Sequence, residues 1–244
     1  MIFLMTDFGS NDIYVGQVKA TLYQHNPTAK VIDLLHDVPN FDAESGAHLL
    51  AALAGKCLLE GSVMLAVVDA GVGGQRQPIV VQADGRWYVG PDNGLLSVLA
   101  ARAASCRQYA IVWQPQGLSN SFHGRDLFAP VAALLAQQKL PQDWLEPLPE
   151  LAVTFGSVDL LQVVYVDHYG NAVTGLRASQ ISQHDELEVG GKVLRYARTF
   201  CESPPGQAFW YENSIGLVEV ALNCGSAAQQ LDLAVGTKVR VISA

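Results

Sequence analysis

The feature that most constrains the fold is a set of short apolar runs, two of which end in aspartate. Residues 2–5 (IFLM) run into Thr6 and Asp7, and residues 61–69 (GSVMLAVVD) end in Asp69. Apolar runs without polar alternation are typical of strands that are covered on both faces of a sheet. Ligands of α/β proteins bind at the carboxyl ends of such strands, so Asp7 and Asp69 become candidate site residues.

Helical patterns alternate with these strands. Residues 13–24 have helical spacing and can be capped by Asn11 or Asp12, while Asp42 is a plausible N-cap for the helix that follows it. The dipeptide Asp84-Gly85 predicts a hairpin. The remaining expected elements are a strand at 31–35, hairpin strands at 77–82 and 86–89, and helices at 95–104 and 127–138. This alternation predicts an α/β domain with a mostly parallel sheet.

The pattern changes after about residue 150. Residues 139–155 hold three prolines and show no sustained period, which indicates a crossing between domains. Short β-rich runs then alternate with Gly, Asp, Asn and Pro turns, as in a small barrel or sandwich. We therefore expect an N-terminal α/β domain over residues 1–150 and a smaller all-β, barrel-like domain over residues 151–244.

Composition narrows the classes of function. Charged residues make up 16% of the chain and the net charge is −8, so no basic surface favours nucleic acid or an anionic membrane. No segment approaches the ~20 apolar residues of a membrane span, and the N-terminal run is too short for a signal peptide. The four cysteines show no CxxC spacing, which argues against a zinc site or a disulfide scaffold. We expect a cytoplasmic protein with a small-molecule substrate.

Residues 121–130 (SFHGRDLFAP) concentrate polar groups between two phenylalanines. His123, Arg125 and Asp126 must each be paired or serve chemistry, because burying such groups without a partner is costly. A structural ion pair between Arg125 and Asp126 is the alternative for those two residues. His123 is the stronger candidate for a site.

Two further segments bring carboxylates to glycine-rich turns. Asp7 and Asp12 are five residues apart and could bind a pair of vicinal hydroxyls or a metal ion, although no third oxygen ligand is evident for a metal. Asp12 could also be a helix cap and nothing more. Asp69 enters the turn AGVGG, and Arg76, seven residues later, is near enough to fold back over it.

The turn DHYGN at residues 167–171 is the candidate in the second domain. Tyr169 offers an aromatic face, and the Asn171 amide can both donate and accept hydrogen bonds, as a planar base would require. An ordinary Asx turn organised by Asp167 is the alternative.

Six motifs in order, spread over essentially the whole chain, resemble the S-adenosyl-L-methionine (SAM) hydroxide adenosyltransferase family, which comprises SAM hydrolases related to the fluorinase and chlorinase. The motifs are TDFGSNDIYVGQVK at 6–19, VVDAGVG at 67–73 with Arg76, GPDNGLL at 90–96, FHGRDLFAP at 122–130, DHYGN at 167–171 and NSIGLVEVALNCGSAA at 213–228. Ile215 and Leu222 depart from the halogenases, which resemble one another in having arginines there.

The resemblance implies hydrolysis of SAM to adenosine and L-methionine by attack of water on the ribose C5′, with SAM as substrate and no cofactor or metal. The family's catalytic residues fall on Asp69, Arg76 and His123. It also implies a homotrimer whose sites lie between the N-terminal domain of one subunit and the C-terminal domain of its neighbour.

The same resemblance implies the substrate-binding positions. Asp7 would hold the ribose hydroxyls, and Phe41 and Phe122 would wall the C5′ pocket. The positions expected around the methionine end are Asp12, Asp167, Tyr211 and Ser214; those around adenine are Tyr169, Asn171 and Phe200; and backbone contacts are expected from Val72 and Cys224.

Rival functions stay open at this point. A halogenase such as a chlorinase would use a halide in place of water, but Asp69 and His123 stand where halogenases resemble one another in having tyrosine, and a carboxylate would repel an anion. Gly124 alone would fit a chlorinase. A non-catalytic adenosyl-ligand-binding protein would have no need for the three catalytic groups. A metallohydrolase lacks the usual ligand spacings.

Overall fold

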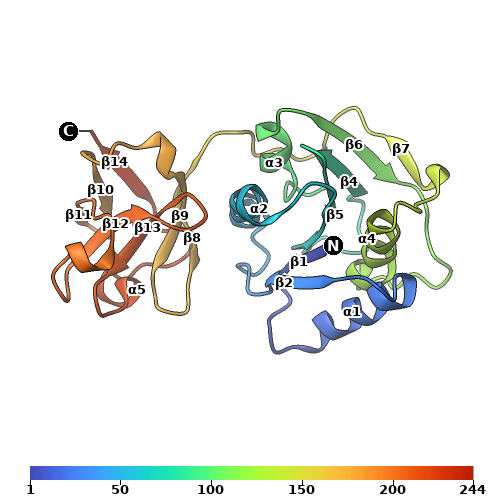
Figure 1. Cartoon of the computed structure of the whole chain (residues 1–244), viewed down its shortest axis with the longest axis horizontal. Helices are drawn as coiled ribbons and strands as arrows, with labels where there is room; N and C mark the ends of the chain where they lie inside the picture. The colour runs from blue at the N-terminus through green and yellow to red at the C-terminus, as the bar shows by residue number, and fades with distance from the viewer. Residues whose placement is uncertain (244) are drawn as a thin grey trace. The chain divides into compact units, whose positions relative to one another are not determined.

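The computed structural model describes residues 1–243, and the chain divides into two compact units. Unit 1 is Met1–Ser157 and unit 2 begins at Val158. Figure 1 shows that helices and a large sheet form unit 1, whereas strands dominate unit 2. The expected combination of an α/β part and a β-rich part is therefore confirmed.

The sheet of unit 1 has seven strands in the order β2-β1-β3-β5-β4-β6-β7. The strands are β1 (Ile2–Thr6), β2 (Val31–Leu35), β3 (Val63–Val67), β4 (Pro78–Ala83), β5 (Arg86–Pro91), β6 (Cys106–Ile111) and β7 (Leu145–Pro147). The pairs β1–β2, β1–β3 and β3–β5 are parallel, and the other three are antiparallel. The expectation of a mostly parallel sheet is thus corrected to a mixed one. The predicted hairpin at Asp84-Gly85 makes β4 antiparallel to β5, and β6 then pairs with β4.

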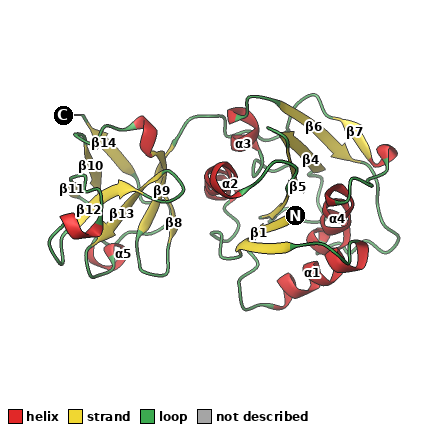
Figure 2. Cartoon of the chain, viewed as in Figure 1, coloured by secondary structure: helices red, strands yellow, loops and turns green. Residues whose placement is uncertain are grey.

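Helices cover both faces of this sheet, with α2 and α3 on one side and α1 and α4 on the other (Figure 2). The helices are α1 (Ile13–His25), α2 (Ala43–Cys57), α3 (Ser97–Arg102) and α4 (Ala129–Ala136). The predicted caps are confirmed, because the carboxylate of Asp12 accepts from the Ile13 N–H and that of Asp42 from the Ser45 N–H.

The buried strands β1 and β3 set the position of the two aspartates. Ile2, Leu4, Val63 and Leu65 belong to one core cluster with residues of α1 and α4, and the alternate residues of both strands are also buried. Thr6 pairs with Val67 in parallel register. Asp7 and Asp69 therefore leave the sheet at the same edge.

Two segments of unit 1 differ from expectation. Part of residues 139–155, expected to cross between domains, forms the turn η2 (Gln142–Trp144) and β7, which pairs with β6. A strand of three residues ending in proline shows no periodicity, so the pattern could not reveal it. The helix expected from residue 127 begins instead as a π-helical turn, η1 (Gly124–Phe128), in which the Ala129 N–H donates to the Gly124 carbonyl.

Unit 2 contains two antiparallel sheets, ordered β12-β13-β9-β8 and β11-β10-β14. Their strands are β8 (Leu160–Val166), β9 (Ala172–Arg177), β10 (Glu186–Val189), β11 (Lys192–Leu194), β12 (Ala208–Glu212), β13 (Leu217–Leu222) and β14 (Val239–Ile242); short helical turns are η3 (Ala178–Gln180), η4 (Phe200–Glu202) and α5 (Ala227–Gln230). Both sheets contribute to one apolar core around Trp210. Closure into a barrel stays a prediction.

Among residues 1–243, every helix is too short or too polar to cross a membrane.

Candidate active site

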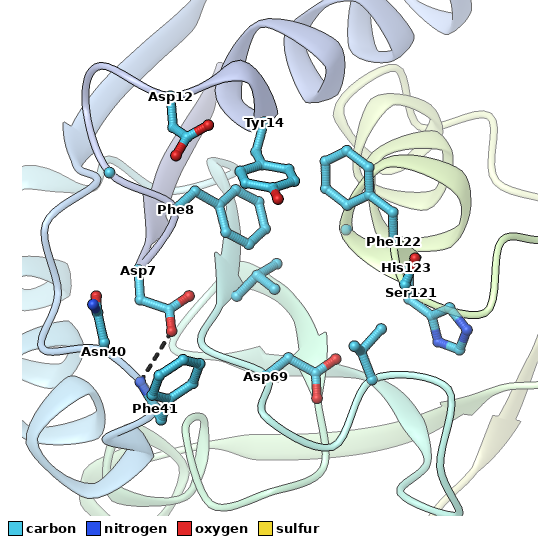
Figure 3. A pocket seen from close by; sticks show the side chains of 14 residues that line it. Asp7, Phe8, Asp12, Tyr14, Asn40, Phe41, Asp69, Ser121, Phe122 and His123 are labelled. Atoms are coloured by element: carbon cyan, nitrogen blue, oxygen red, sulfur yellow. Dashed lines mark hydrogen bonds between the residues drawn. The ribbon is translucent and has the colours of Figure 1, made fainter.

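A cavity of about 530 Å³ opens at the carboxyl ends of β1 and β3 in unit 1 (Figure 3). Four loops line it: the one after β1, the one before α2, the one after β3 and the one before η1. The predicted residues that line it are Asp7, Asp12, Phe41, Asp69, Val72, Phe122 and His123. The structure therefore gathers one set of predicted positions, spread over more than a hundred residues, around a single cavity.

Asp69, Arg76 and His123 form one hydrogen-bonded cluster at this cavity. The Arg76 Nε lies 2.9 and 3.0 Å from the two carboxylate oxygens of Asp69, and its Nη2 donates to the same carboxylate. That Nη2 also lies 3.0 Å from the His123 Nδ1. The side chains of Asp69 and Arg76 are only 4% and 9% exposed. The predicted folding of Arg76 over Asp69 is confirmed.

The contact with Arg76 determines the tautomer of His123. A guanidinium group has donors and no acceptor, so the His123 Nδ1 must be the acceptor, and the neutral ring carries its proton on Nε2. Burial and the neighbouring Arg76 charge lower the pKa of His123 below its usual 6.5, against the opposite influence of Asp69 and Asp126. The ring is therefore neutral near pH 7.

A glycine allows the two loops of the cluster to meet. Gly73 has a φ of +76°, and a Cβ there would lie 2.1 Å from the carbonyl oxygen of Asn120. Only glycine tolerates both the backbone conformation and this approach. The loop that carries Asp69 and Arg76 is thus held against the loop that leads to His123.

Asp7 has different partners from Asp69. Its carboxylate accepts a hydrogen bond of 3.1 Å from the Phe41 N–H, drawn as a dashed line in Figure 3. Burial raises the pKa of Asp7, and the negative charge of Asp69 acts in the same direction. Phe41 itself has a φ of 63°, a left-handed conformation that is rare for a bulky residue, and the residue is 76% exposed.

An aromatic wall completes the cavity. The rings of Phe8, Tyr14 and Phe122 lie 5.4–5.8 Å apart, centroid to centroid. Gly124 makes room for this wall, because a Cβ there would lie 3.2 Å from the ring of Phe8. Sequence reasoning missed Phe8 and Tyr14, although both stand in the motif TDFGSNDIYVG, whose apolar members could have signalled them.

The alternative interpretation holds for two polar residues of the decapeptide. The Arg125 Nε lies 2.6 Å from Asp126, and its Nη1 lies 2.9 Å from the Gln17 side chain. The second oxygen of Asp126 accepts from the Ser119 N–H. Arg125 and Asp126 therefore stabilise the loop before η1 by linking it to α1 through Gln17 and to the main chain at Ser119.

Within unit 2, Asp167 organises the predicted turn. Its Oδ1 accepts from the backbone N–H groups of Tyr169 and Asn171 at 2.9 and 2.8 Å, and its Oδ2 accepts from the Asn171 side chain. This is the Asx turn considered as the alternative. Tyr169 is 76% exposed in this turn, while Asn171 is buried.

The other predicted positions of unit 2 lie in η4, in β12 and on the turns before and after β13. The rings of Phe200 and Tyr211 have centroids 5.5 Å apart. Ser214 and Cys224 lie on exposed turns before and after β13. Sequence reasoning missed Glu219, a buried carboxylate that accepts from the Tyr211 hydroxyl at 2.5 Å and whose pKa is raised by burial.

In the part of the chain that the structure describes, no three His, Cys, Asp or Glu side chains gather as a metal site would require.

The fold and the cavity define an α/β protein with a carboxylate-lined cavity at the ends of its parallel strands, where α/β proteins bind their ligands. Residues 2–144 match the N-terminal domain and residues 161–240 the C-terminal domain of the SAM hydroxide adenosyltransferases. The chain belongs to the SAM hydroxide adenosyltransferase family, as its motifs predicted.

Its relatives include curated enzymes and solved structures. The "(R)-S-adenosyl-L-methionine hydrolase" of Thermus thermophilus is 39% identical, with 99% of each chain covered, and that of Salinispora arenicola is 37% identical over 97% of this chain and 95% of its own. A fluorinase of Nocardia brasiliensis is 24% identical, with 99% of this chain and 96% of the fluorinase covered. A solved structure of an uncharacterized conserved protein from Thermotoga maritima is 30% identical with a TM-score of 0.89, covering 99% of this chain and all of that one.

Proposed function

We propose that the protein is a SAM hydrolase that forms adenosine and L-methionine. The observation that carries this proposal is the Asp69–Arg76–His123 cluster beside the cavity. Its relatives at 36–39% identity are named as hydrolases of SAM, whereas the relatives named as fluorinases are only 22–24% identical. The hydrolase is therefore favoured over the halogenase.

The reaction needs a nucleophile more than it needs an acid. The water oxygen forms a bond to the ribose C5′ as the bond from C5′ to the sulfonium sulfur breaks, and methionine leaves as a neutral thioether. The water gives up one proton, so a proton acceptor in the cavity would assist the attack. Asp7 lines the same cavity, and in this proposal its carboxylate accepts hydrogen bonds from the ribose hydroxyls and thereby orients C5′.

The three catalytic groups divide this work. Arg76 is always protonated and cannot be the base. The Nδ1 of His123 already accepts from Arg76, so its Nε2–H is left to donate to the oxygen of the attacking water. Asp69 then accepts the proton, because a carboxylate keeps lone pairs beyond those that Arg76 occupies. Arg76 is hydrogen-bonded to both Asp69 and His123 and so holds the two side chains at fixed positions.

The proposal includes the binding positions in unit 2 and the assembly. Tyr169, Asn171 and Phe200 would contact adenine, and Asp167, Tyr211 and Ser214 would surround the methionine end, with unit 2 supplied by a neighbouring subunit of a homotrimer. Phe41 at the cavity and Tyr169 in unit 2 are both exposed, which supports their covering by ligand or partner, since aromatic residues are enriched at interfaces. Sedimentation analysis tests the trimer. The cytoplasmic location stays a prediction.

Product analysis tests the reaction directly. The purified protein is incubated with each sulfonium epimer of SAM, because the relatives' names specify the (R) form, in buffer with and without chloride. We expect adenosine and methionine in equal amounts, independent of chloride. Formation of 5′-chloro-5′-deoxyadenosine would identify a chlorinase, and binding without product would identify a non-catalytic binder.

A further inference from the structure

The GPDNG motif at residues 90–94 begins with the last two residues of β5, and the proposed reaction gives it no role. Two of its groups reach the main chain beside the catalytic cluster. The Asn93 Nδ2 donates to the Val68 carbonyl at 2.7 Å, and the Asp92 N–H donates to the Gln77 carbonyl at 2.8 Å. This loop therefore contacts two separate main-chain positions with hydrogen bonds of good length.

These two main-chain positions enclose the catalytic segment. Val68 immediately precedes Asp69, and Gln77 immediately follows Arg76. The GPDNG loop thus holds both ends of the segment whose two charged side chains meet each other and His123.

We propose that Asn93 is a positioning residue for Asp69, and that its amide fixes the Val68 peptide from which Asp69 extends. The kinetic part of this inference rests on the proposed function. The Asn93 side chain is itself oriented, because its Oδ1 accepts from the Leu95 N–H at 3.3 Å while its Nδ2 points to Val68. An amide bound at both its oxygen and its nitrogen cannot rotate without losing a partner.

The loop that carries Asn93 is anchored on its other side. The buried Asp92 carboxylate accepts from the Ala152 N–H at 2.9 Å. Gly94 has a φ of +96°, and a Cβ there would lie 2.3 Å from the ring of Phe155, whose N–H donates to the Ser97 hydroxyl oxygen at 3.0 Å. A positioning residue on such a packed base can hold a catalytic group within the tolerance that catalysis needs.

A small displacement of Asp69 would lower the rate of the proposed reaction. Asp69 is the proposed proton acceptor, and it shares Arg76 with His123. A misplacement of about 1 Å can cost on the order of a hundredfold in rate. Loss of the Asn93 amide therefore affects the rate constant of the reaction more than the binding of ribose through Asp7.

The test compares Asn93→Ala with Asn26→Ala. Asn26 is a matched control, because its Nδ2 also donates to a main-chain carbonyl, that of Ala133, and its Oδ1 also accepts, from Thr28. It lies at the C-terminal end of α1 and does not line the cavity. We measure kcat and KM for SAM, and the titration of the His123 ring by NMR, assigned from its loss in His123→Gln.

For Asn93→Ala we expect kcat to fall about tenfold, with KM changed by less than about twofold. The His123 titration should move to higher pH, because the Arg76 charge that lowers the pKa of His123 is held less closely. Asn26→Ala should leave kcat, KM and the His123 titration unchanged. Equal losses of kcat in the two variants, or an unmoved His123 titration, would overturn the proposal.

The NMR readout does not depend on SAM turnover. If the wild-type protein fails to hydrolyse SAM, the proposed function fails, yet a shifted His123 titration in Asn93→Ala still supports the positioning role and an unshifted one still overturns it. If Asn93→Ala does not fold, Asn93→Asp keeps the acceptor for Leu95 and replaces the donor to Val68 with a charged carboxylate oxygen that cannot donate. An unchanged kcat and KM in that variant would overturn the proposal.

Discussion

Asp7 and Asp69 extend from neighbouring parallel strands at the same edge of one sheet, yet their surroundings differ. Asp69 is paired with the guanidinium of Arg76, which also binds His123. Asp7 receives a hydrogen bond from the Phe41 N–H, and burial raises its pKa. The strands deliver both carboxylates to the cavity, and the loops that follow decide what each can do.

The difference between the two loops has a chemical consequence. The loop after β3 folds back over Asp69 and places the Arg76 guanidinium against it. This arrangement suits a carboxylate that must act on water at a fixed position. Asp7, at the end of β1, receives instead a neutral donor, the Phe41 N–H of the loop before α2, which suits a group that accepts hydrogen bonds from a ligand. Asp69 should therefore govern turnover, and Asp7 should govern binding.

The largest effect is expected from Asp69→Asn. The amide cannot accept the proton of the attacking water, so kcat should fall by roughly 10²–10⁴ while KM changes little. Steady-state kinetics with SAM measures both. Asp159→Asn is the control, because Asp159 is paired with Arg177 at 2.6 Å in unit 2. This variant should be less stable than wild type but should show no comparable loss of kcat. A loss of substrate affinity as large as the loss of kcat would contradict the assignment of Asp69.

Gly73→Ala should separate the two loops of the cluster. Its Cβ would meet the Asn120 carbonyl, so we expect a loss of about 1–3 kcal/mol in unfolding free energy and at least a tenfold loss of kcat. Gly61→Ala is a matched control, since Gly61 has the same φ of +76° and nothing within 4 Å of the added Cβ. Denaturant unfolding and kinetics of both variants separate backbone strain from the contact with Asn120. Equal effects in the two would show that the contact is unimportant.

A more moderate effect is expected from Asp7→Asn. The amide keeps one acceptor oxygen but loses the charge, and we expect KM and the Kd of adenosine to rise about tenfold, with kcat within a few-fold of wild type. Calorimetric titration with adenosine measures the binding part without turnover. If kcat fell as far as in Asp69→Asn, the division of labour between the two carboxylates would be wrong.

The smallest effect concerns pH. The pKa of His123 in the folded protein lies below 6.5, its usual value. At pH values between this lowered pKa and 6.5, the unfolded chain therefore binds more protons than the folded protein does. The His123 contribution to stability is therefore complete above pH 6.5 and is lost as the pH falls through the folded pKa. Thermal unfolding of wild type and His123→Gln over this range should show a steeper acid loss for wild type. Parallel curves would mean that His123 titrates as it does in the unfolded chain.

The sequence was informative wherever a local pattern determined the structure. Two apolar runs that end in aspartate predicted the positions of Asp7 and Asp69, and the short spacing to Arg76 predicted its return over Asp69. The caps at Asp12 and Asp42 and the hairpin at Asp84-Gly85 follow from side-chain chemistry within a few residues. Each of these is a short-range effect.

What could not be predicted depends on contacts between distant segments. His123 meets Arg76 across 47 residues, and no local rule indicates that pairing. The antiparallel edge of the sheet ends in β7, whose three residues show no period, and the π-helical turn at Gly124 resembles an ordinary helix start in sequence. The role of GPDNG also appears only when Val68 and Gln77 are seen beside Asn93 and Asp92.

The central claim is that the Asp69–Arg76–His123 cluster directs water to the ribose C5′. The most direct measurement is mass spectrometry of the products formed from SAM in water labelled with oxygen-18. We expect the label to enter the 5′-hydroxyl of adenosine and methionine to stay unlabelled, with product formation reduced in Asp69→Asn. Label in methionine, or a 5′-halogenated nucleoside in place of labelled adenosine, would contradict it.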